Sequence, residues 1–371
     1  MNVPPPDRPK AGPSKTGEGE ADEPVSPPSW GQRREFAEHR SAPPEPAGCA
    51  KPAVGQGPGG RPLLLCGDIG GTKSLLGLAQ SGEFMVDRRY ANADFPDFAS
   101  VLAAFFADTR TVASGISGGC LAIAGPIADD GRSARLTNLP WGIDDAELSR
   151  RFGLPALTLA NDFAAAALGA VTSSPAHRFT LQEGEPLGSA RRLVVGAGTG
   201  LGMAIVLPQG ETWRVVPGEG GHIAFAPADE EQTALWSFLR ARHGRVTWER
   251  VVSGPGLAAI HEFVAGVELA PEEIATRAMA SPNGAERRSL DLFLAAYGAF
   301  AGDMAMACLA RGGVFLAGGI AAKLLPVLRQ SGFLAAFNAK AEHAAIAARM
   351  PIHVATDPLL GLHGALHLAC E

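Results

Sequence analysis

The chain has 371 residues, of which 46% are hydrophobic and 19% are charged, and its formal net charge is -6. This length and apolar content suffice for two domains with cores of their own, whereas the acidic balance argues against general nucleic-acid binding. No apolar run reaches the roughly 18 residues of a membrane span. Five scattered cysteines without a Cys-x-x-Cys pair suit a reducing compartment and no structural zinc. We therefore expect a cytoplasmic protein with neither a nucleic-acid nor a membrane partner.

Residues 1–60 differ in composition from the rest of the chain. They hold 13 of the 29 prolines, and their eight acidic and seven basic side chains nearly cancel. A segment with so few periodic apolar residues cannot form a packed core. We expect a disordered Pro/Gly-rich tail, and it contains no helix-turn-helix pattern.

Residues 63–80 read LLLCGDIGGTKSLLGLAQ. An apolar strand ends near Asp68, and a Gly-Gly-Thr-Lys turn leads into a second apolar strand. Glycines let the backbone N–H groups of such a turn face a phosphate, and Asp68 lies where it could hold a metal ion on that phosphate. The Walker A pattern is not met, because Thr72 replaces its second glycine and no helix follows. The segment is predicted to be a β-hairpin whose turn holds phosphate.

Residues 192–216 repeat this design. An apolar strand leads into a turn of Gly198, Thr199 and Gly200, and two more strands follow. The dinucleotide fingerprint G-x-G-x-x-G does not fit, because leucine or methionine occupies its last position and no helix pattern follows. We infer a duplicated fold with one phosphate hairpin in each half.

Strands and helical patterns alternate after Arg61. A strand that runs into a Gly-Pro turn is expected at 119–127, and further strands at 156–160 and 314–317. Helices are expected at 144–152, 163–170, 233–243, 289–310 and 320–330, and a terminal helix interrupted by glycine at 357–370. Strand triplets followed by this alternation predict an α/β protein of two similar lobes with a central cleft. We place a small lobe at 61–172, against which the terminal helix of 355–371 packs back, and a large lobe at 173–354.

Polar clusters lie beside the expected strand ends and glycine turns. Asn161 and Asp162 suit a helix N-cap, but ligands also bind at such strand ends, where a carboxylate can accept a proton from a hydroxyl. Glu219 and His222 lie on a glycine loop, PGEGGH, in a spacing that suits a clamp for sugar hydroxyls. Glu249 precedes a Ser-Gly-Pro-Gly turn. These side chains are candidates for binding and proton transfer.

Gly318 and Gly319 follow an apolar strand and precede a helical pattern. Such a pair could lie against the flat face of a nucleoside, with the helix N-terminus near phosphate. Thr137, Asn138 and Trp141 form a further loop. For that loop, the wall of an acceptor pocket and an ordinary Pro-linked turn are both open interpretations.

Together these motifs resemble the bacterial glucokinase family of the actin-like/hexokinase/Hsp70 ATPase superfamily. The motifs GDIGGTK, LAIAGPI, TNLPW, LANDF, GAGTGLG, PGEGGHIAFAP, ERVVSGPG and FLAGGI run in family order through residues 63–320. Lys73 departs from the asparagine of many bacterial glucokinases and is more typical of the related ROK kinases. The zinc-binding cysteines of ROK kinases are missing after His222, which favours the zinc-free glucokinase group.

The resemblance implies a duplicated actin-like, ribonuclease H-like fold and the phosphorylation of glucose at its 6-hydroxyl by ATP and Mg²⁺, feeding glycolysis. It implies that Asp162 is the general base and that glucose is bound by Asn161, Asp162, Glu219, His222 and Glu249. It assigns phosphate and nucleotide contacts to Asp68, Gly70, Gly71, Thr72, Lys73, Gly198, Thr199, Gly200, Gly318 and Gly319. Asp68 would hold Mg²⁺, directly or through water, and the family suggests a homodimer.

Two other functions stay open from the sequence. A kinase for another sugar, such as mannose or an N-acetylated hexosamine, would differ around Glu219 and Glu249. A sugar-sensing regulator without turnover would share the fold, but the retained Asp162 and the missing DNA-binding pattern oppose it. The phosphoryl donor is open as well, because polyphosphate would use backbone contacts similar to those of ATP.

Overall fold

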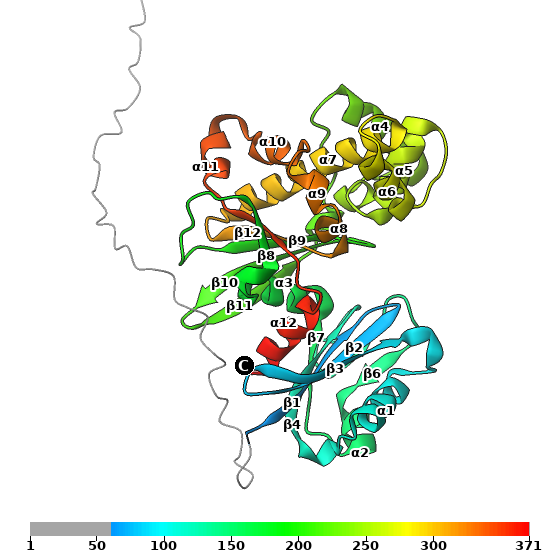
Figure 1. Ribbon diagram of the computed structural model, residues 1–371, viewed down its shortest axis with the longest axis vertical. Helices are drawn as coiled ribbons and strands as arrows, with labels where there is room; N and C mark the ends of the chain where they lie inside the picture. Colours follow the sequence, from blue (N-terminus) through cyan, green and yellow to red (C-terminus); the bar gives the residue numbers. More distant parts are fainter. Residues whose placement is uncertain (1–60, 371) are drawn as a thin grey trace, which may run out of the picture. The chain divides into compact units, whose positions relative to one another are not determined.

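The computed structural model describes residues 61–370. The tail expected at 1–60 and the final residue lie outside the described residues. Two mixed β-sheets with helices packed against them make up most of this part (Figure 1). A separate pair of short strands is formed by β5 (Ser133–Arg135) and β6 (Gly142–Asp144).

The first sheet has the strand order β3-β2-β1-β4-β7. The first three strands are antiparallel, whereas β4 and β7 add parallel to β1. The register pairs Ile69 with Ser74, so the glycine turn 70–73 closes the β1–β2 hairpin. The strands are β1 (Leu63–Ile69), β2 (Lys73–Gln80), β3 (Glu83–Ala91), β4 (Ile116–Ile123) and β7 (Thr158–Asn161).

The second sheet has the order β11-β10-β9-β12-β13-β8. Its first five strands repeat the directions of the first sheet, three antiparallel and two parallel, and β8 is added antiparallel. The duplicated architecture expected from the two hairpins is therefore confirmed. The strands are β8 (Arg178–Gln182), β9 (Arg192–Ala197), β10 (Leu201–Gln209), β11 (Thr212–Gly218), β12 (Gly313–Ala317) and β13 (Ile352–Ala355).

The helices match several sequence expectations in place but not always in length. They are α1 (Phe98–Thr109), α2 (Asp145–Phe152), α3 (Asp162–Thr172), α4 (Glu230–His243), α5 (Gly254–Ala265), α6 (Pro271–Ala280), α7 (Ala285–Cys308), α8 (Gly319–Lys323), α9 (Leu325–Leu328), α10 (Phe333–Asn338), α11 (Ala344–Ala348) and α12 (Leu360–Ala369). The sequence pattern did not indicate α1, α5, α6, α10 or α11.

Two differences from the expected helices have a clear local cause. The helix expected at 320–330 is divided into α8 and α9 at Leu324, because Pro326 in the first turn of α9 has no N–H to continue the helical ladder. The terminal helix begins at Leu360, because the carboxylate of Asp357 accepts a hydrogen bond of 2.8 Å from the N–H of Leu359 and forms a turn there.

The helices α3 and α12 contact each other closely and link the two sheets. Helix α12 packs on β1 and β4 of the first sheet, whereas α3 packs on strands β9 to β12 of the second. Glycine makes the approach possible: a Cβ atom on Gly169 would overlap the carbonyl of Leu360, and one on Gly364 would overlap that of Ala165. Figure 1 shows this helix pair between the two sheets.

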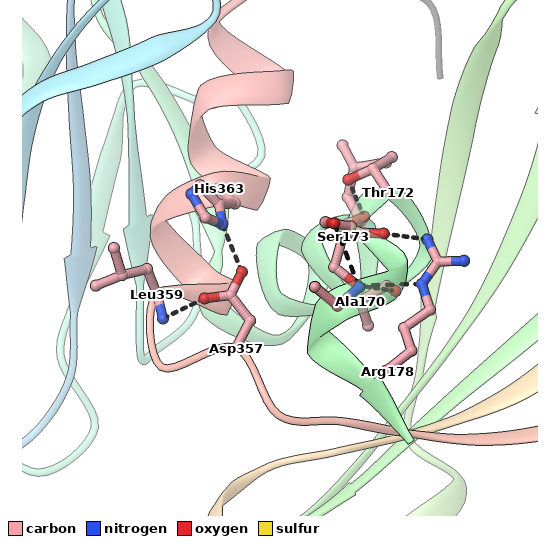
Figure 2. A network of polar contacts seen from close by, with 10 residues as sticks. Ala170, Thr172, Ser173, Arg178, Asp357, Leu359 and His363 are labelled. Atoms are coloured by element: carbon pink, nitrogen blue, oxygen red, sulfur yellow. Dashed lines mark hydrogen bonds and ion pairs between the residues drawn. The ribbon is translucent and has the colours of Figure 1, made fainter. Parts of the chain in front are cut away.

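The chain crosses from the first sheet to the second after α3 and returns before α12. Polar contacts stabilise both crossing segments (Figure 2). Arg178 of β8 donates to the backbone carbonyls of Val171 and Ser173 at the C-terminal end of α3, where a positive charge is favourable. Near the start of α12, the Nδ1–H of His363 donates to the carboxylate of Asp357 over 2.5 Å. These contacts hold the ends of the helices that link the sheets.

Helix α7 is the core helix of the second half. Within residues 61–370, it alone is long and apolar enough by length and composition to cross a membrane. However, 72% of its most apolar stretch is buried against the protein, and Phe293, Tyr297 and Phe300 lie fully in the core. It is therefore the buried helix that the sequence predicted, beginning earlier than expected.

Candidate active site

The first glycine turn is a compact hairpin with two exposed residues, Thr72 and Lys73. The N–H of Gly70 donates to the carbonyl of Lys73 over 3.0 Å. A Cβ atom on Gly71 would lie 3.0 Å from the Cβ of Asn138. The loop that contains Asn138 therefore lies against the first hairpin.

Asp68 lies one residue before the end of β1, directly before this turn. It is half-buried, and no donor within residues 61–370 hydrogen-bonds to its carboxylate. A Cβ atom on Gly361 would lie only 2.5 Å from its Oδ2 atom, so α12 covers it closely. Burial, together with the charge of Asp162, raises the pKa of Asp68 to about 6, and the charge of Lys73 opposes this shift.

Asn161 and Asp162 lie where β7 ends and α3 begins. The Oδ1 atom of Asn161 caps the helix by accepting from the N–H groups of Phe163 and Ala164 at 3.0 and 3.1 Å. The Oδ1 atom of Asp162 also accepts from the N–H of Phe163, at 2.8 Å. Burial raises the pKa of Asp162 above its ordinary value, which makes this carboxylate a better proton acceptor.

The second glycine turn joins β9 to β10 and is tied to two other segments. The N–H of Gly198 donates to the carbonyl of Gly200 over 2.8 Å, while the carbonyl of Gly198 accepts from Gly254 at the start of α5 over 2.8 Å. The N–H of Leu201 donates to the Oε2 atom of Glu249 over 2.9 Å. Thr199 at the tip of the turn is exposed.

Glu219 and His222 face each other on a glycine loop beside this turn. Their side chains are 89% and 61% exposed, and the Oε2 and Nδ1 atoms are 3.5 Å apart. A Cβ atom on Gly221 would overlap the carbonyl of Leu201, so the loop lies directly on the start of β10. Within residues 61–370, no hydrogen bond or ion pair connects this pair with Asn161 or Asp162.

Gly318 and Gly319 also meet the second turn. Gly318 has a φ of +85°, a left-handed conformation that favours glycine, and a Cβ atom on it would lie 2.8 Å from the carbonyl oxygen of Ala197. Ala197 is the last residue of β9. The start of α8 is thus held against the root of the second turn, while Gly319 has open space beside it.

Phe163 connects the start of α3, where Asp162 lies, with the second glycine turn, a contact that the sequence did not predict. Its ring lies on Gly196 and Gly202, which face each other in the β9–β10 register, and a Cβ atom on either glycine would overlap the ring. The neighbour of Asp162 therefore packs at the root of the second turn. The signal in the sequence is a pair of in-strand glycines flanking the turn, because such glycines mark a close approach.

Comparisons with known proteins identify the family of this chain. The sequence model of the glucokinase family matches residues 65–371. The chain belongs to the glucokinase family. A glucokinase of Trichormus variabilis is 38% identical to it over 336 residues, covering 82% of this chain and 97% of the relative.

Two solved glucokinases have the same fold. The glucokinase from an Antarctic psychrotroph is 28% identical, has a TM-score of 0.73, and covers 83% of this chain and 98% of its own. The glucokinase of Balamuthia mandrillaris, solved in complex with glucose, is 25% identical, has a TM-score of 0.69, and covers 84% of this chain and 94% of its own. The actin-like architecture expected from the sequence is thereby confirmed for this glucokinase-family chain.

Proposed function

We propose that this chain is a glucokinase that transfers the terminal phosphoryl group of ATP to the 6-hydroxyl of glucose. The observation that carries the proposal is the position of Asp162, a half-buried carboxylate at the start of α3 with a raised pKa. It shares the electrostatic environment of Asp68 at the first glycine turn, and its neighbour Phe163 packs at the root of the second. Phosphoryl transfer requires mainly such positioning of a hydroxyl against a phosphate.

The sugar would be held by Asn161, Asp162, Glu219, His222 and Glu249. Carboxylates accept hydrogen bonds from sugar hydroxyls, and an imidazole can donate or accept. The exposure of Glu219 and His222 leaves these groups free to bind a ligand. Asp162 would accept the proton of the 6-hydroxyl as the oxygen attacks the phosphorus atom.

The nucleotide would be held by backbone groups of the two glycine turns and of Gly318 and Gly319. Open N–H groups in such turns bind phosphate oxygens. Phosphate contacts would come from Gly70, Gly71, Thr72, Lys73, Gly198, Thr199 and Gly200.

Asp68 fits a magnesium site. Mg²⁺ usually keeps several waters and is held by one or two carboxylates together with substrate phosphates. A half-buried carboxylate that accepts no hydrogen bond from the described part of the chain, residues 61–370, next to the proposed phosphate turn, offers this chemistry. When bound, Mg²⁺ would neutralise charge on the phosphates.

We further propose that residues 61–172 with 355–371 and residues 173–354 act as two lobes that close over the substrates. Closure would exclude water, which competes with glucose as the phosphoryl acceptor. We place the enzyme in the cytoplasm as a homodimer, where glucose phosphorylation feeds glycolysis.

An ADP-release assay with ATP, Mg²⁺ and a panel of sugars tests the proposal. We expect turnover with glucose, and Asp162→Asn should lower kcat by about 10²–10⁴, the usual contribution of a general base. Asp144→Asn is the matched control, because Asp144 also accepts from a backbone N–H in the first turn of a helix but lies at the start of α2. Faster turnover with mannose or a hexosamine would reassign the substrate, and absence of turnover with every sugar would indicate a sensor.

A further inference from the structure

Asn92 follows the edge strand β3 and is buried against the first glycine turn. It is 2% exposed, and Ser74, which it contacts, is fully buried. Its Nδ2 atom donates to the carbonyl of Gly70 over 2.8 Å, and its backbone N–H donates to the carbonyl of Thr72 over 3.0 Å. The hydroxyl of Ser74 donates to its Oδ1 atom over 2.8 Å. One buried residue thus holds two carbonyl groups of the turn and contacts Ser74 of β2.

The chemistry of the partners determines which way the amide of Asn92 points. A backbone carbonyl only accepts hydrogen bonds, so the atom that faces Gly70 must be Nδ2. The oxygen is then directed at Ser74, whose hydroxyl donates to it. Rotating the amide would lose the hydrogen bond to Gly70 and turn the Oδ1 atom toward that carbonyl oxygen, in a buried place where an unsatisfied polar group is unfavourable.

These contacts determine which side of the turn presents N–H groups. A trans peptide unit is planar, with its C=O and N–H pointing in opposite directions. Holding the carbonyl of Gly70 toward Asn92 therefore directs the N–H of Gly71 to the other side. Within residues 61–370, the N–H groups of Gly71 and Thr72 donate to no protein acceptor. They remain available to an anion, and the carbonyl oxygens of Gly70 and Thr72 are bound by Asn92.

We propose that Asn92 is a positioning residue that keeps the peptide groups of the first turn directed toward the nucleotide phosphates. The inference rests on the proposed role of this turn in phosphate binding. Gly70 and Gly71 allow backbone conformations that other residues avoid, so without Asn92 the peptide between them can rotate and present its carbonyl oxygen to a phosphate. Nucleotide binding would weaken, and glucose binding would not.

Steady-state kinetics of the full-length chain test this inference. Asn92→Ala should lower kcat/KM for ATP by about tenfold, the size of one or two net hydrogen bonds, with the KM for glucose unchanged within twofold. Asn92→Asp should be at least as impaired, because it places an oxygen opposite the carbonyl of Gly70. Ser74→Ala should show a smaller fall, about threefold, since it frees the amide without removing it.

Controls separate positioning from a loss of stability. Asn338→Ala removes a part-buried asparagine on α10 that donates to Gln182, and Ser289→Ala removes a fully buried hydroxyl on α7. Both should leave kcat/KM for ATP unchanged, even where the thermal midpoint falls. The inference would be overturned if Asn92→Ala changed the KM for glucose as much as it changed kcat/KM for ATP. It would also be overturned if Asn338→Ala lowered kcat/KM for ATP as much as Asn92→Ala does.

A direct binding measurement keeps this inference separate from the proposed sugar substrate. Calorimetric titration with the nonhydrolysable analogue AMPPNP should give a Kd about tenfold higher for Asn92→Ala than for the wild-type chain. That difference is expected even if glucose is not the acceptor. An unchanged Kd would reject the role of Asn92, whereas missing turnover of the wild-type chain with glucose would reject only the proposed reaction.

Discussion

The carboxylate of Glu249 accepts a hydrogen bond of 2.9 Å from the backbone N–H of Leu201, directly after the second glycine turn. A Cβ atom on Gly200 would lie 2.7 Å from the same Oε2 atom, so the side chain lies flat against the turn. Glu249 was expected only as a sugar ligand. The structure gives it a second contact, which couples the proposed sugar site with a proposed phosphate site.

This contact predicts that two substitutions of Glu249 will differ. Glu249→Gln keeps an oxygen that can accept from Leu201, so it should raise mainly the KM for glucose. Glu249→Ala loses both contacts and should raise the KM for ATP as well, by about three- to tenfold. Glu219→Ala is the matched control, because within residues 61–370 the Glu219 carboxylate forms an ion pair with His222 and no other, and the substitution should raise the KM for glucose alone. Equal KM values for ATP in all three variants would contradict the coupling.

A pH-dependent stability difference is expected from Asp68. Its pKa is raised from 3.8 to about 6, so the folded chain binds more protons than the unfolded chain between these values, and stability falls as pH rises through this range. Asp68→Asn removes the ionisation. Without ligands, the variant should be more stable than the wild type at pH 8 by about 1–3 kcal/mol, with a smaller gain at pH 5.

Denaturant unfolding at both pH values measures this difference. The same variant should lose turnover, because its amide is a poorer ligand for Mg²⁺ than a carboxylate. A gain in the free energy of unfolding that is equal at pH 5 and pH 8 would show that the ionisation of Asp68 is not the cause.

Phe163 is expected to hold Asp162 in place. Its ring packs on Gly196 and Gly202, and its N–H donates to Asp162. Phe163→Ala should lower kcat by about tenfold, because the carboxylate loses its packed neighbour. Gly202→Ala should act in the same direction by displacing the ring. Phe238→Ala, a half-buried ring on α4, should lower only the thermal midpoint; a similar kcat loss there would point to general destabilisation.

Lys73 is expected to contribute its charge to nucleotide binding. Its side chain is exposed, yet its charge lowers the pKa of Asp68, so it acts at the first turn. Lys73→Met should raise the KM for ATP by about two- to fivefold at low salt, with less effect at high salt because screening weakens an exposed charge. Arg110→Met on the α1 cap is a control for exposed charge. A KM that does not depend on salt would place the Lys73 ammonium away from the phosphates.

Much of the site is local and could therefore be predicted. Asn161 was expected at a helix N-cap, and its side chain caps α3. Both glycine turns lie at the ends of expected strands, because turn chemistry depends on neighbouring residues. Helix limits were less accurate where a proline or a side-chain turn intervened, as at Pro326 and Asp357.

The sequence by itself determined the duplicated fold, the order of the motifs and the residue types that suit phosphoryl transfer. Only the tertiary structure decided that Asn92 holds the first turn, that Glu249 holds the second, and that Phe163 joins the two. These contacts could not be predicted from the sequence, because Ser74 and Asn92 are 18 residues apart and Leu201 and Glu249 are 48 residues apart. Spacing along a chain predicts neighbours within a helix or hairpin, whereas contacts between elements depend on how the sheets and helices pack.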